Sequence, residues 1–291
     1  MNTPQPKEQP QTMRSTINHL IQLQELILIR DEQRSIRGSS ADLSAINTSI
    51  DAMIESLEPE VKTNFNRIYK KDHITVAPMN NGSCSMCGMH LAISQIQSVK
   101  LCRQLIPCPS CGRTLYDPSG AKWVAERKSR ASAEQKIGIA RFSSPDLMLV
   151  DLKGTTPAEV IAEMAMALEK AQFVDDSSKL TEAAIAREDI LGTGIGHELA
   201  FPHVRGIEGG GLSLAFGVSK KGVKFKGMTD TPARFIFFST IPTAVSAFYL
   251  KLLAGLSESF TKEANRKMAL DADTPEALWK ALTKASRYTV K

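Results

Sequence analysis

The sequence predicts helices and a small cysteine-rich β module, followed by an α/β domain in which helices flank a mixed sheet. Three observations predict this order. Apolar residues recur at helical spacing before residue 72, all five cysteines lie between Cys84 and Cys111, and helical and strand patterns alternate from residue 141 onward. The 291 residues are enough for two domains. The hydrophobic fraction of 42% and charged fraction of 23% are ordinary for a soluble globular protein.

The segment 15–72 reads as a helical hairpin. A first helix begins near Thr16, and its apolar positions are Ile17, Leu20, Leu23 and Ile27. After the break at 37–40, a second set is spaced alternately by three and four residues, as in a coiled-coil seam: Leu43, Ile46, Ile50, Met53 and Leu57. We expect the two helices to pack antiparallel, although contact with a partner helix or a second copy stays open. Pro59 is suited to open a third helix.

The ends of this region carry less information. Residues 1–14 are polar and Pro- and Gln-rich, and we expect them to be disordered. They lack the layout of a secretory signal, and no apolar run approaches the roughly 20 residues that span a bilayer. We therefore expect a cytoplasmic protein without membrane insertion.

The net charge of +5 is modest. The basic run within 119–140 reads as a solvated linker, and contact with RNA or an acidic partner is the alternative.

The cysteines of segment 73–118, which otherwise reads as short strands and tight turns, predict a metal site. Cys84 and Cys87 form one C-x-x-C pair, and Cys108 and Cys111 form a second. Two such pairs supply the four thiolates of a closed, structural Zn²⁺ site, with an iron–sulfur cluster or redox thiols as alternatives. A glycine follows each pair, where the backbone often needs a conformation that glycine adopts cheaply. Cys102 reads as a small buried hydrophobic residue.

This front part resembles the bacterial proteins that join a coiled-coil hairpin to a zinc ribbon. The matching segments are Glu58–Glu60, Phe65–Ile68, Val76–Pro78, Asn81–Gly88, Cys108–Arg113 and Leu115–Tyr116. The hairpin is shorter here than is usual in that family. The resemblance implies contacts with proteins, and sometimes with nucleic acid.

The segment 141–291 predicts one α/β domain. Helices are expected at 157–171, 178–188, 243–259 and 274–284, and strands at 212–218 and 234–239. Thr156 before Pro157 and Thr274 before Pro275 are helix-start signals. No internal repeat is present.

A chemically suggestive run follows the second of these helices. Arg187 lies near the helix end, a Gly-rich turn follows at 192–196, and a short strand then delivers Pro202 and His203. A neutral imidazole nitrogen is a competent nucleophile. Arg187 and Arg205 bracket His203 in sequence and could neutralise a phosphoryl group, to which the Thr193 hydroxyl could donate a hydrogen bond. A structural or surface histidine is the alternative, and the run is neither a Walker loop nor a dinucleotide fingerprint.

Residues 141–291 resemble the phosphotransferase-system IIA domains of the fructose, mannitol and nitrogen-regulatory type. The resemblance is carried by Arg187-Glu188, Thr193–Gly196 and Pro202-His203, with support from Phe216–Val218, Val223–Phe225 and Leu250–Leu253. It implies that His203 accepts phosphate from a histidine-containing phosphocarrier protein and that Arg187 stabilises it.

Two positions depart from the pattern of that family. Tyr249 stands where a second histidine is usual; a tyrosine hydroxyl can donate a hydrogen bond to phosphate but cannot act as an imidazolium. His197 stands where asparagine is common, and it reads as a surface turn residue.

Three functions follow as hypotheses. The first is a regulatory IIA-like phosphoacceptor, a phosphohistidine phosphotransferase in the broad sense, whose zinc-ribbon and coiled-coil module binds a regulated protein. The second is a sugar-transport component that passes phosphate to a separate permease subunit. The third is a protein that is not phosphorylated and binds protein or nucleic acid through the ribbon or the basic linker.

Overall fold

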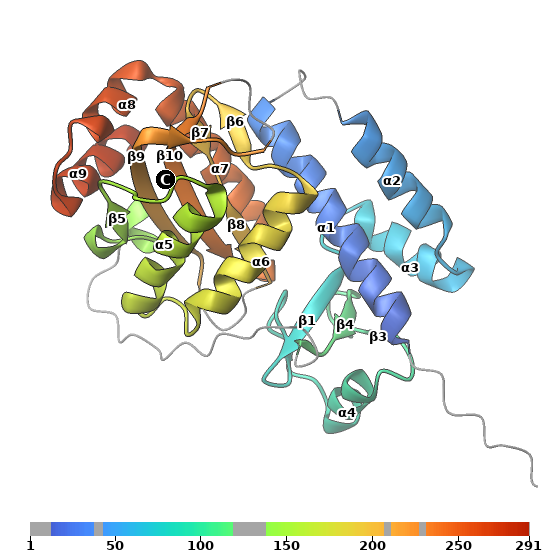
Figure 1. Cartoon of the computed structure of the whole chain (residues 1–291). Helices are drawn as coiled ribbons and strands as arrows, with labels where there is room; N and C mark the ends of the chain where they lie inside the picture. Colours follow the sequence, from blue (N-terminus) through green and yellow to red (C-terminus); the bar gives the residue numbers. More distant parts are fainter. Residues whose placement is uncertain (1–12, 38–42, 119–137, 207–210, 227–230, 291) are drawn as a thin grey trace, which may run out of the picture. The chain divides into compact units, whose positions relative to one another are not determined.

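The computed structural model describes residues 13–37, 43–118, 138–206, 211–226 and 231–290 (Figure 1). The chain divides into two compact units, Met1–Arg30 with Leu43–Lys122 and Asp31–Asp42 with Trp123–Lys291. Helix α1 (Arg14–Arg37) contributes residues to both units. Residues 1–12 of the expected disordered start and residues 119–137 of the expected basic linker lie outside the described part of the chain.

The first unit has a helical core formed by α1, α2 (Ser44–Glu55) and α3 (Pro59–Tyr69). As the sequence predicts, Pro59 occupies the first turn of α3, where no backbone donor is needed. The apolar side chains buried together are Leu20, Leu23, Ile27, Ile50, Leu57, Phe65 and Val76. The core is therefore wider than a two-helix seam, because α3 and a strand residue complete it.

A small sheet follows in the same unit. Its strands are β1 (Val76–Asn80), β2 (Ser83–Cys84), β3 (Ile106–Pro107) and β4 (Thr114–Tyr116), in the order β2-β1-β4-β3. The sequence predicts only strands and turns here, and the structure adds helix α4 (Ile93–Leu101). Within α4 only Val99 is buried, and Ile93 at the start of the helix is exposed, so the helix buries little of its apolar surface.

The second unit is built on a mixed six-stranded sheet. Its strands are β5 (Met148–Leu149), β6 (Gly194–Gly196), β7 (Leu199–Ala200), β8 (His203–Arg205), β9 (Ser213–Val223) and β10 (Ala233–Ile241). The order is β5-β9-β10-β7-β6, and β8 also pairs with β10. Strand β10 runs antiparallel to β9 and parallel to β7 and β8. The predicted mixed sheet is confirmed.

Helices flank this sheet. They are α5 (Pro157–Lys170), α6 (Ser177–Ile190), α7 (Ser246–Thr261), α8 (Glu263–Leu270) and α9 (Pro275–Ser286). Short 3-10 turns occur at Gly138–Arg141, Pro145–Leu147 and Thr243–Val245. Thr156 caps α5 by accepting a hydrogen bond from the Glu159 amide, and Thr274 caps α9 in the same way. Helix α8 is an element that the sequence reasoning did not anticipate.

The centre of the sheet is covered on both faces. Phe235, Ile236, Phe237 and Phe238 are consecutive in β10, and all are fully buried. Because successive side chains of a strand point to opposite faces, such a run requires cover on each side. Figure 1 shows α5 and α6 in front of the sheet and α7 behind it. None of the helices in the described residues has the length and apolar character needed to cross a membrane.

Candidate functional site

The polar run around His203 starts at the end of α6. The helix ends at Ile190, and its last turn holds Arg187. The Arg187 side chain bends toward the helix terminus, where Nη1 donates to the Leu191 carbonyl oxygen at 2.8 Å. Arginine near a helix C-terminus is favourable because it satisfies a carbonyl that has no partner within the helix. This contact leaves the rest of the guanidinium available to other groups.

The turn in this run lies later than the sequence predicts. Gly194–Gly196 forms strand β6 rather than a Gly-rich turn, and the chain reverses at His197 and Glu198, whose φ values are +51° and +64°. Two successive residues with positive φ are typical of the tight turns that join twisted hairpin strands. His197 is exposed, in agreement with its interpretation as a surface turn residue.

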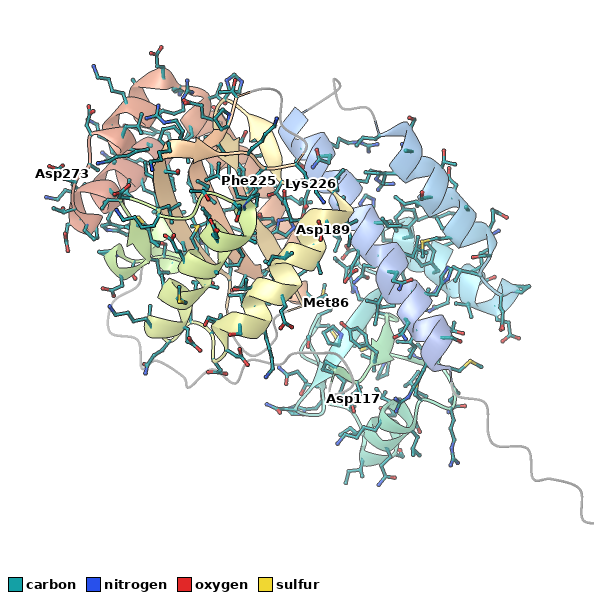
Figure 2. The ribbon with its side chains drawn as sticks, in the orientation of Figure 1. Met86, Asp117, Asp189, Phe225, Lys226 and Asp273 are labelled. Atoms are coloured by element: carbon teal, nitrogen blue, oxygen red, sulfur yellow. The ribbon has the colours of Figure 1, made fainter. Side chains whose placement is uncertain are left out.

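Gly192 is required by close packing. A Cβ atom at this position would lie 2.0 Å from the Lys226 carbonyl oxygen. The side chains of Lys226 and Asp189, labelled in Figure 2, form an ion pair that ties the end of α6 to the segment after β9. This ion pair is largely exposed, so we expect it to contribute little to stability.

His203 begins β8 and is 2% exposed. Its Nδ1 atom lies 3.0 Å from the Phe201 carbonyl oxygen. A carbonyl only accepts, so in the neutral ring Nδ1 carries the proton and Nε2 keeps a lone pair. Burial lowers the pKa of His203 below its ordinary value, and a neighbouring carboxylate only partly opposes this effect. The imidazole is therefore neutral at physiological pH, with Nε2 as a nucleophilic atom.

The neighbouring carboxylate belongs to Glu32, which lies in the same compact unit. Glu32 Oε1 forms an ion pair with Arg205 Nη2, and Oε2 lies 3.1 Å from Arg187 Nη2. His203 Nε2 is 3.2 Å from Glu32 Oε1, although this contact is not aligned as a hydrogen bond. Burial alone would raise the pKa of Glu32, but the guanidinium groups of Arg205 and Arg187 hold it well below its ordinary value. Glu32 is therefore a buried carboxylate anion.

The sequence reasoning did not single out Glu32. It stands within the charged stretch Arg30–Arg34, which reads as an ordinary solvated helix face. Only its 2% exposure and its contact with two arginines mark it as part of a site. No pattern in the sequence alone carries that signal.

Tyr249 of α7 completes the ring contacts of the site. Its ring centroid lies 5.4 Å from that of His203, and Arg205 Cζ lies 5.4 Å from the Tyr249 centroid. Burial, with Glu32 adding to it, raises the pKa of Tyr249. The tyrosine is thus a neutral hydroxyl beside the imidazole, in the region where the sequence reasoning placed it.

Thr193 is connected to the segment before His203 through its backbone. Its backbone amide donates to both carboxylate oxygens of the buried Glu188, at 3.2 and 3.0 Å, and its carbonyl accepts from the Phe201 amide at 3.1 Å. Burial raises the pKa of Glu188. These contacts join the segment after α6 to the residues before His203.

Several buried polar atoms of this group have no well-aligned hydrogen-bond partner among the described residues. They are Arg187 Nε, Thr193 Oγ1, His203 Nε2, Arg205 Nε and Nη1, and Tyr249 Oη. Buried polar groups are normally paired, so such a concentration calls for a ligand or bound water. Most of these atoms are donors, which indicates an anion. We call the group Arg187, His203, Arg205 and Tyr249, with Glu32 among them, the His203 site.

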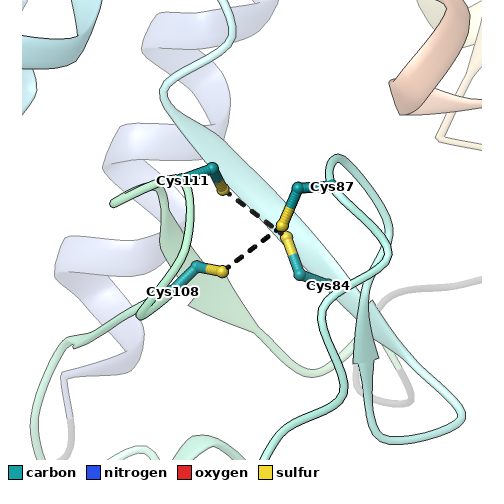
Figure 3. A group of neighbouring side chains, drawn as sticks. All are labelled: Cys84, Cys87, Cys108 and Cys111. Carbon is teal, nitrogen blue, oxygen red and sulfur yellow. Dashed lines mark hydrogen bonds between the residues drawn. The ribbon is translucent and has the colours of Figure 1, made fainter.

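The second candidate site is the cysteine cluster, defined as Cys84, Cys87, Cys108 and Cys111 (Figure 3). The four sulfur atoms lie within 4.8 Å of one another. The Sγ atoms of Cys84 and Cys111 are 3.8 Å apart, and those of Cys87 and Cys108 are 3.6 Å apart. Metal–sulfur bonds of about 2.3 Å at tetrahedral angles place sulfur atoms about 3.8 Å apart, so the cluster could hold a metal ion.

The two C-x-x-C turns have the same backbone geometry. The Gly88 amide donates to the Cys84 carbonyl at 2.9 Å, and the Gly112 amide donates to the Cys108 carbonyl at 2.8 Å. Both glycines have positive φ, +73° and +76°, as their position after each pair predicts. The turns therefore hold each thiolate pair facing one point.

The fifth cysteine and a nearby histidine lie outside this cluster. Cys102 is buried at the end of α4 with φ +51°, in agreement with its interpretation as a small buried residue. His90 Nδ1 lies 3.1 Å from the Ser83 hydroxyl and is not among the clustered atoms.

Comparisons with known proteins bear on the second unit. A family model described as "Phosphoenolpyruvate-dependent sugar phosphotransferase system, EIIA 2" matches residues 141–285. The "PTS system fructose-specific EIIA component" of Haloferax volcanii is 30% identical over 105 residues, which are 36% of this chain and 68% of that protein.

Two further relatives each match about half of the chain. The "PTS system fructose-specific EIIABC component" of Bacillus subtilis is 30% identical over 140 residues, 48% of this chain, and the match spans only 22% of that protein's length. The "Nitrogen regulatory protein" of Pseudomonas aeruginosa is 26% identical over 147 residues, which are 49% of this chain and 93% of that protein.

Proposed function

Since this chain belongs, through residues 141–285, to the EIIA 2 family of the phosphoenolpyruvate-dependent sugar phosphotransferase system, we propose that it accepts a phosphoryl group on His203 from a histidine-containing phosphocarrier protein. The observation that carries this proposal is the Nδ1 contact of His203 with the Phe201 carbonyl at 3.0 Å. It leaves the Nε2 lone pair free, in a site where Arg187 and Arg205 meet at Glu32.

The proposed transfer needs no metal and no proton exchange. The Nε2 lone pair attacks the phosphorus of the donor phosphohistidine, the new P–N bond forms, and the donor nitrogen keeps the electron pair of the bond that breaks. The proton stays on Nδ1, which keeps its hydrogen bond to the Phe201 carbonyl oxygen. Both bonds are phosphoramidates of similar energy, so catalysis consists of positioning and charge stabilisation.

The charge stabilisation falls to three groups. We propose that Arg187 and Arg205 bind the phosphoryl oxygens, because Arg187 Nε and Arg205 Nε and Nη1 are buried donors without an aligned partner. The Tyr249 hydroxyl would donate a further hydrogen bond. Thr193 would orient the segment through its backbone contacts, and its hydroxyl is a buried group that could turn toward the phosphate.

We favour regulation over sugar transport as the use of this phosphorylation. Tyr249 stands in place of the usual second histidine and cannot act as an imidazolium. The nitrogen regulatory relative is matched over 93% of its length. In the transport alternative, the phosphoryl group would pass quickly to a separate permease subunit.

For the first unit we propose a structural Zn²⁺ ion bound by the cysteine cluster. Four thiolates complete a tetrahedral shell and leave no position for a substrate, so the ion would stabilise the small sheet rather than react. The proposal includes the division of the chain into a hairpin over 15–72, a ribbon over 73–118, a linker over 119–140 and the IIA-like domain over 141–291. The hairpin and ribbon would bind the regulated partner.

The test is incorporation of label from phosphoenolpyruvate in the presence of enzyme I and a phosphocarrier protein. We expect acid-labile label on the wild type and less than about a hundredth of it on His203→Gln. His197→Gln is the matched control, because His197 is an exposed histidine of the same segment and should be labelled like the wild type. Equal labelling of His203→Gln, or an unlabelled wild type beside a labelled known acceptor, would contradict the proposal and favour an interaction protein.

A further inference from the structure

The most unusual feature of the second unit is that its anion site already contains an anion. Glu32 is 2% exposed, and its two carboxylate oxygens contact Arg187 and Arg205. Burying a carboxylate is strongly unfavourable unless charged partners compensate. Here the compensation comes from the two guanidinium groups that the proposed function gives to the phosphoryl group. Glu32 thus engages the same two guanidinium groups through their Nη2 atoms, beside the donors that the proposed function assigns to the phosphoryl group.

At its position in the structure, the Glu32 carboxylate would crowd a phosphoryl group on His203 Nε2. Glu32 Oε1 is 3.2 Å from His203 Nε2. A phosphorus atom about to be attacked must lie about 3–3.5 Å from the nucleophile, with its oxygens around it. The carboxylate therefore stands in the volume from which the phosphoryl group must approach.

The other groups facing the carboxylate do not relieve this conflict. Tyr249 is a neutral hydroxyl whose pKa is raised by its burial. His203 itself is neutral at physiological pH, because burial lowers its pKa. The two arginines are the only cations that contact Glu32 among the described residues. A doubly charged phosphoryl group would repel the carboxylate and compete with it for both arginines.

We propose that Glu32 is an internal competitor of the phosphoryl group, a carboxylate that closes the His203 site until it is displaced. This inference rests on the proposed function, because it assumes that His203 is the acceptor. Phosphorylation then releases Glu32 and the α1 residues near it from the site, and those residues become accessible only in the phosphorylated protein. Phosphorylation of His203 would in this way expose the end of α1 that carries Glu32.

The first experiment compares labelling rates in the full chain. Glu32→Gln keeps the size of the side chain but removes its charge, and we expect it to be labelled at least about ten times faster than the wild type. Glu32→Asp keeps the charge on a shorter side chain and should fall between the two. Glu182→Gln, which neutralises an exposed carboxylate on α6, should label like the wild type. Equal or slower labelling of Glu32→Gln would overturn the inference while leaving the phosphoacceptor function intact.

The second experiment does not depend on a donor protein. Inorganic phosphate is titrated calorimetrically into the wild type, Glu32→Gln and Glu32→Gln/Arg205→Met. We expect Glu32→Gln to bind phosphate at least about ten times more tightly than the wild type, and the double variant to lose that gain. Unchanged affinity in Glu32→Gln would overturn the inference. If no variant is labelled in the first experiment, the proposed function fails, and this titration still decides whether Glu32 occupies an anion site.

Discussion

The cysteine cluster and the His203 site are organised in opposite ways. The cluster is formed by two short turns, each of which holds its thiolates through contacts between neighbouring residues, such as the Gly88 amide on the Cys84 carbonyl. The His203 site brings together groups far apart in sequence, and Arg205 is 173 residues from Glu32. The cluster gathers four like groups that repel as thiolates and require a cation. The His203 site gathers cations and contains its own anion.

The two sites therefore obtain their stability from different sources. A metal site of four thiolates is incomplete without its ion, so its folding free energy comes largely from binding. The His203 site is neutralised from within the protein, so it can fold without a ligand. A ligand there must displace Glu32, whereas a metal ion at the cluster only has to bind.

The largest effect should follow the loss of one thiolate. We expect Cys108→Ser to lose the proposed Zn²⁺ ion, because a three-thiolate site forfeits much of the roughly 10 kcal/mol or more that structural zinc contributes in small domains. The measurement is metal content per chain by mass spectrometry, together with the amide spectrum of residues 73–118. Cys102→Ser is the control, since Cys102 lies outside the cluster, and it should keep one ion per chain. Retention of the ion by Cys108→Ser would break the comparison.

A smaller effect should follow the removal of one charge from the His203 site. We expect Arg205→Met to lower the free energy of unfolding by about 3 kcal/mol, because it leaves the buried Glu32 carboxylate with less compensation. In the double variant Glu32→Met/Arg205→Met, most of that loss should be recovered. Denaturant unfolding of the wild type, the single variants Arg205→Met and Glu32→Met, and the double variant gives the coupling energy between Glu32 and Arg205. If the losses of unfolding free energy in the two single variants simply add, Glu32 and Arg205 are not coupled. The idea that Arg205 neutralises Glu32 within the fold is then wrong.

The smallest expected effect concerns pH. The folded-state pKa of Glu32 lies below its ordinary value of 4.5, so its stabilising contribution is complete above about pH 5.5 and is lost as the pH falls through the folded-state pKa. Below pH 4.5 the unfolded chain binds a proton at Glu32 that the folded protein does not. The comparison belongs in a His203→Gln background, because the imidazole also titrates and responds to Glu32.

In that background, we expect the difference in unfolding free energy between the proteins with and without Glu32→Gln to be constant from about pH 7 to 5.5. It should shrink below about pH 4.5. Denaturant unfolding at a series of pH values measures it, and Glu188 titrates in both proteins and cancels. A difference that is independent of pH would mean that Glu32 is not a charged carboxylate in the fold.

Much of the architecture was predictable because its signals are local. The caps at Thr156 and Thr274 were read from a threonine followed by proline, and both accept the expected backbone hydrogen bonds. The mixed sheet and the cysteine cluster are confirmed as well. The position of the turn before His203 was wrong, because glycines at 194 and 196 suit a strand as well as a turn, whereas His197 and Glu198 adopt positive φ only in the folded hairpin.

By itself, the sequence determined which residues could do chemistry: two cysteine pairs with the spacing of a metal site, and a histidine placed after a strand-like segment between two arginines. Those properties depend on the spacing of residues along the chain, which can be read directly from the sequence. Only the tertiary structure decided what each group faces. It brought Tyr249 to 5.4 Å from the His203 ring and Glu32 to both arginines. Contacts between such distant parts of the chain depend on how the helices cover the sheet, and no local pattern records them.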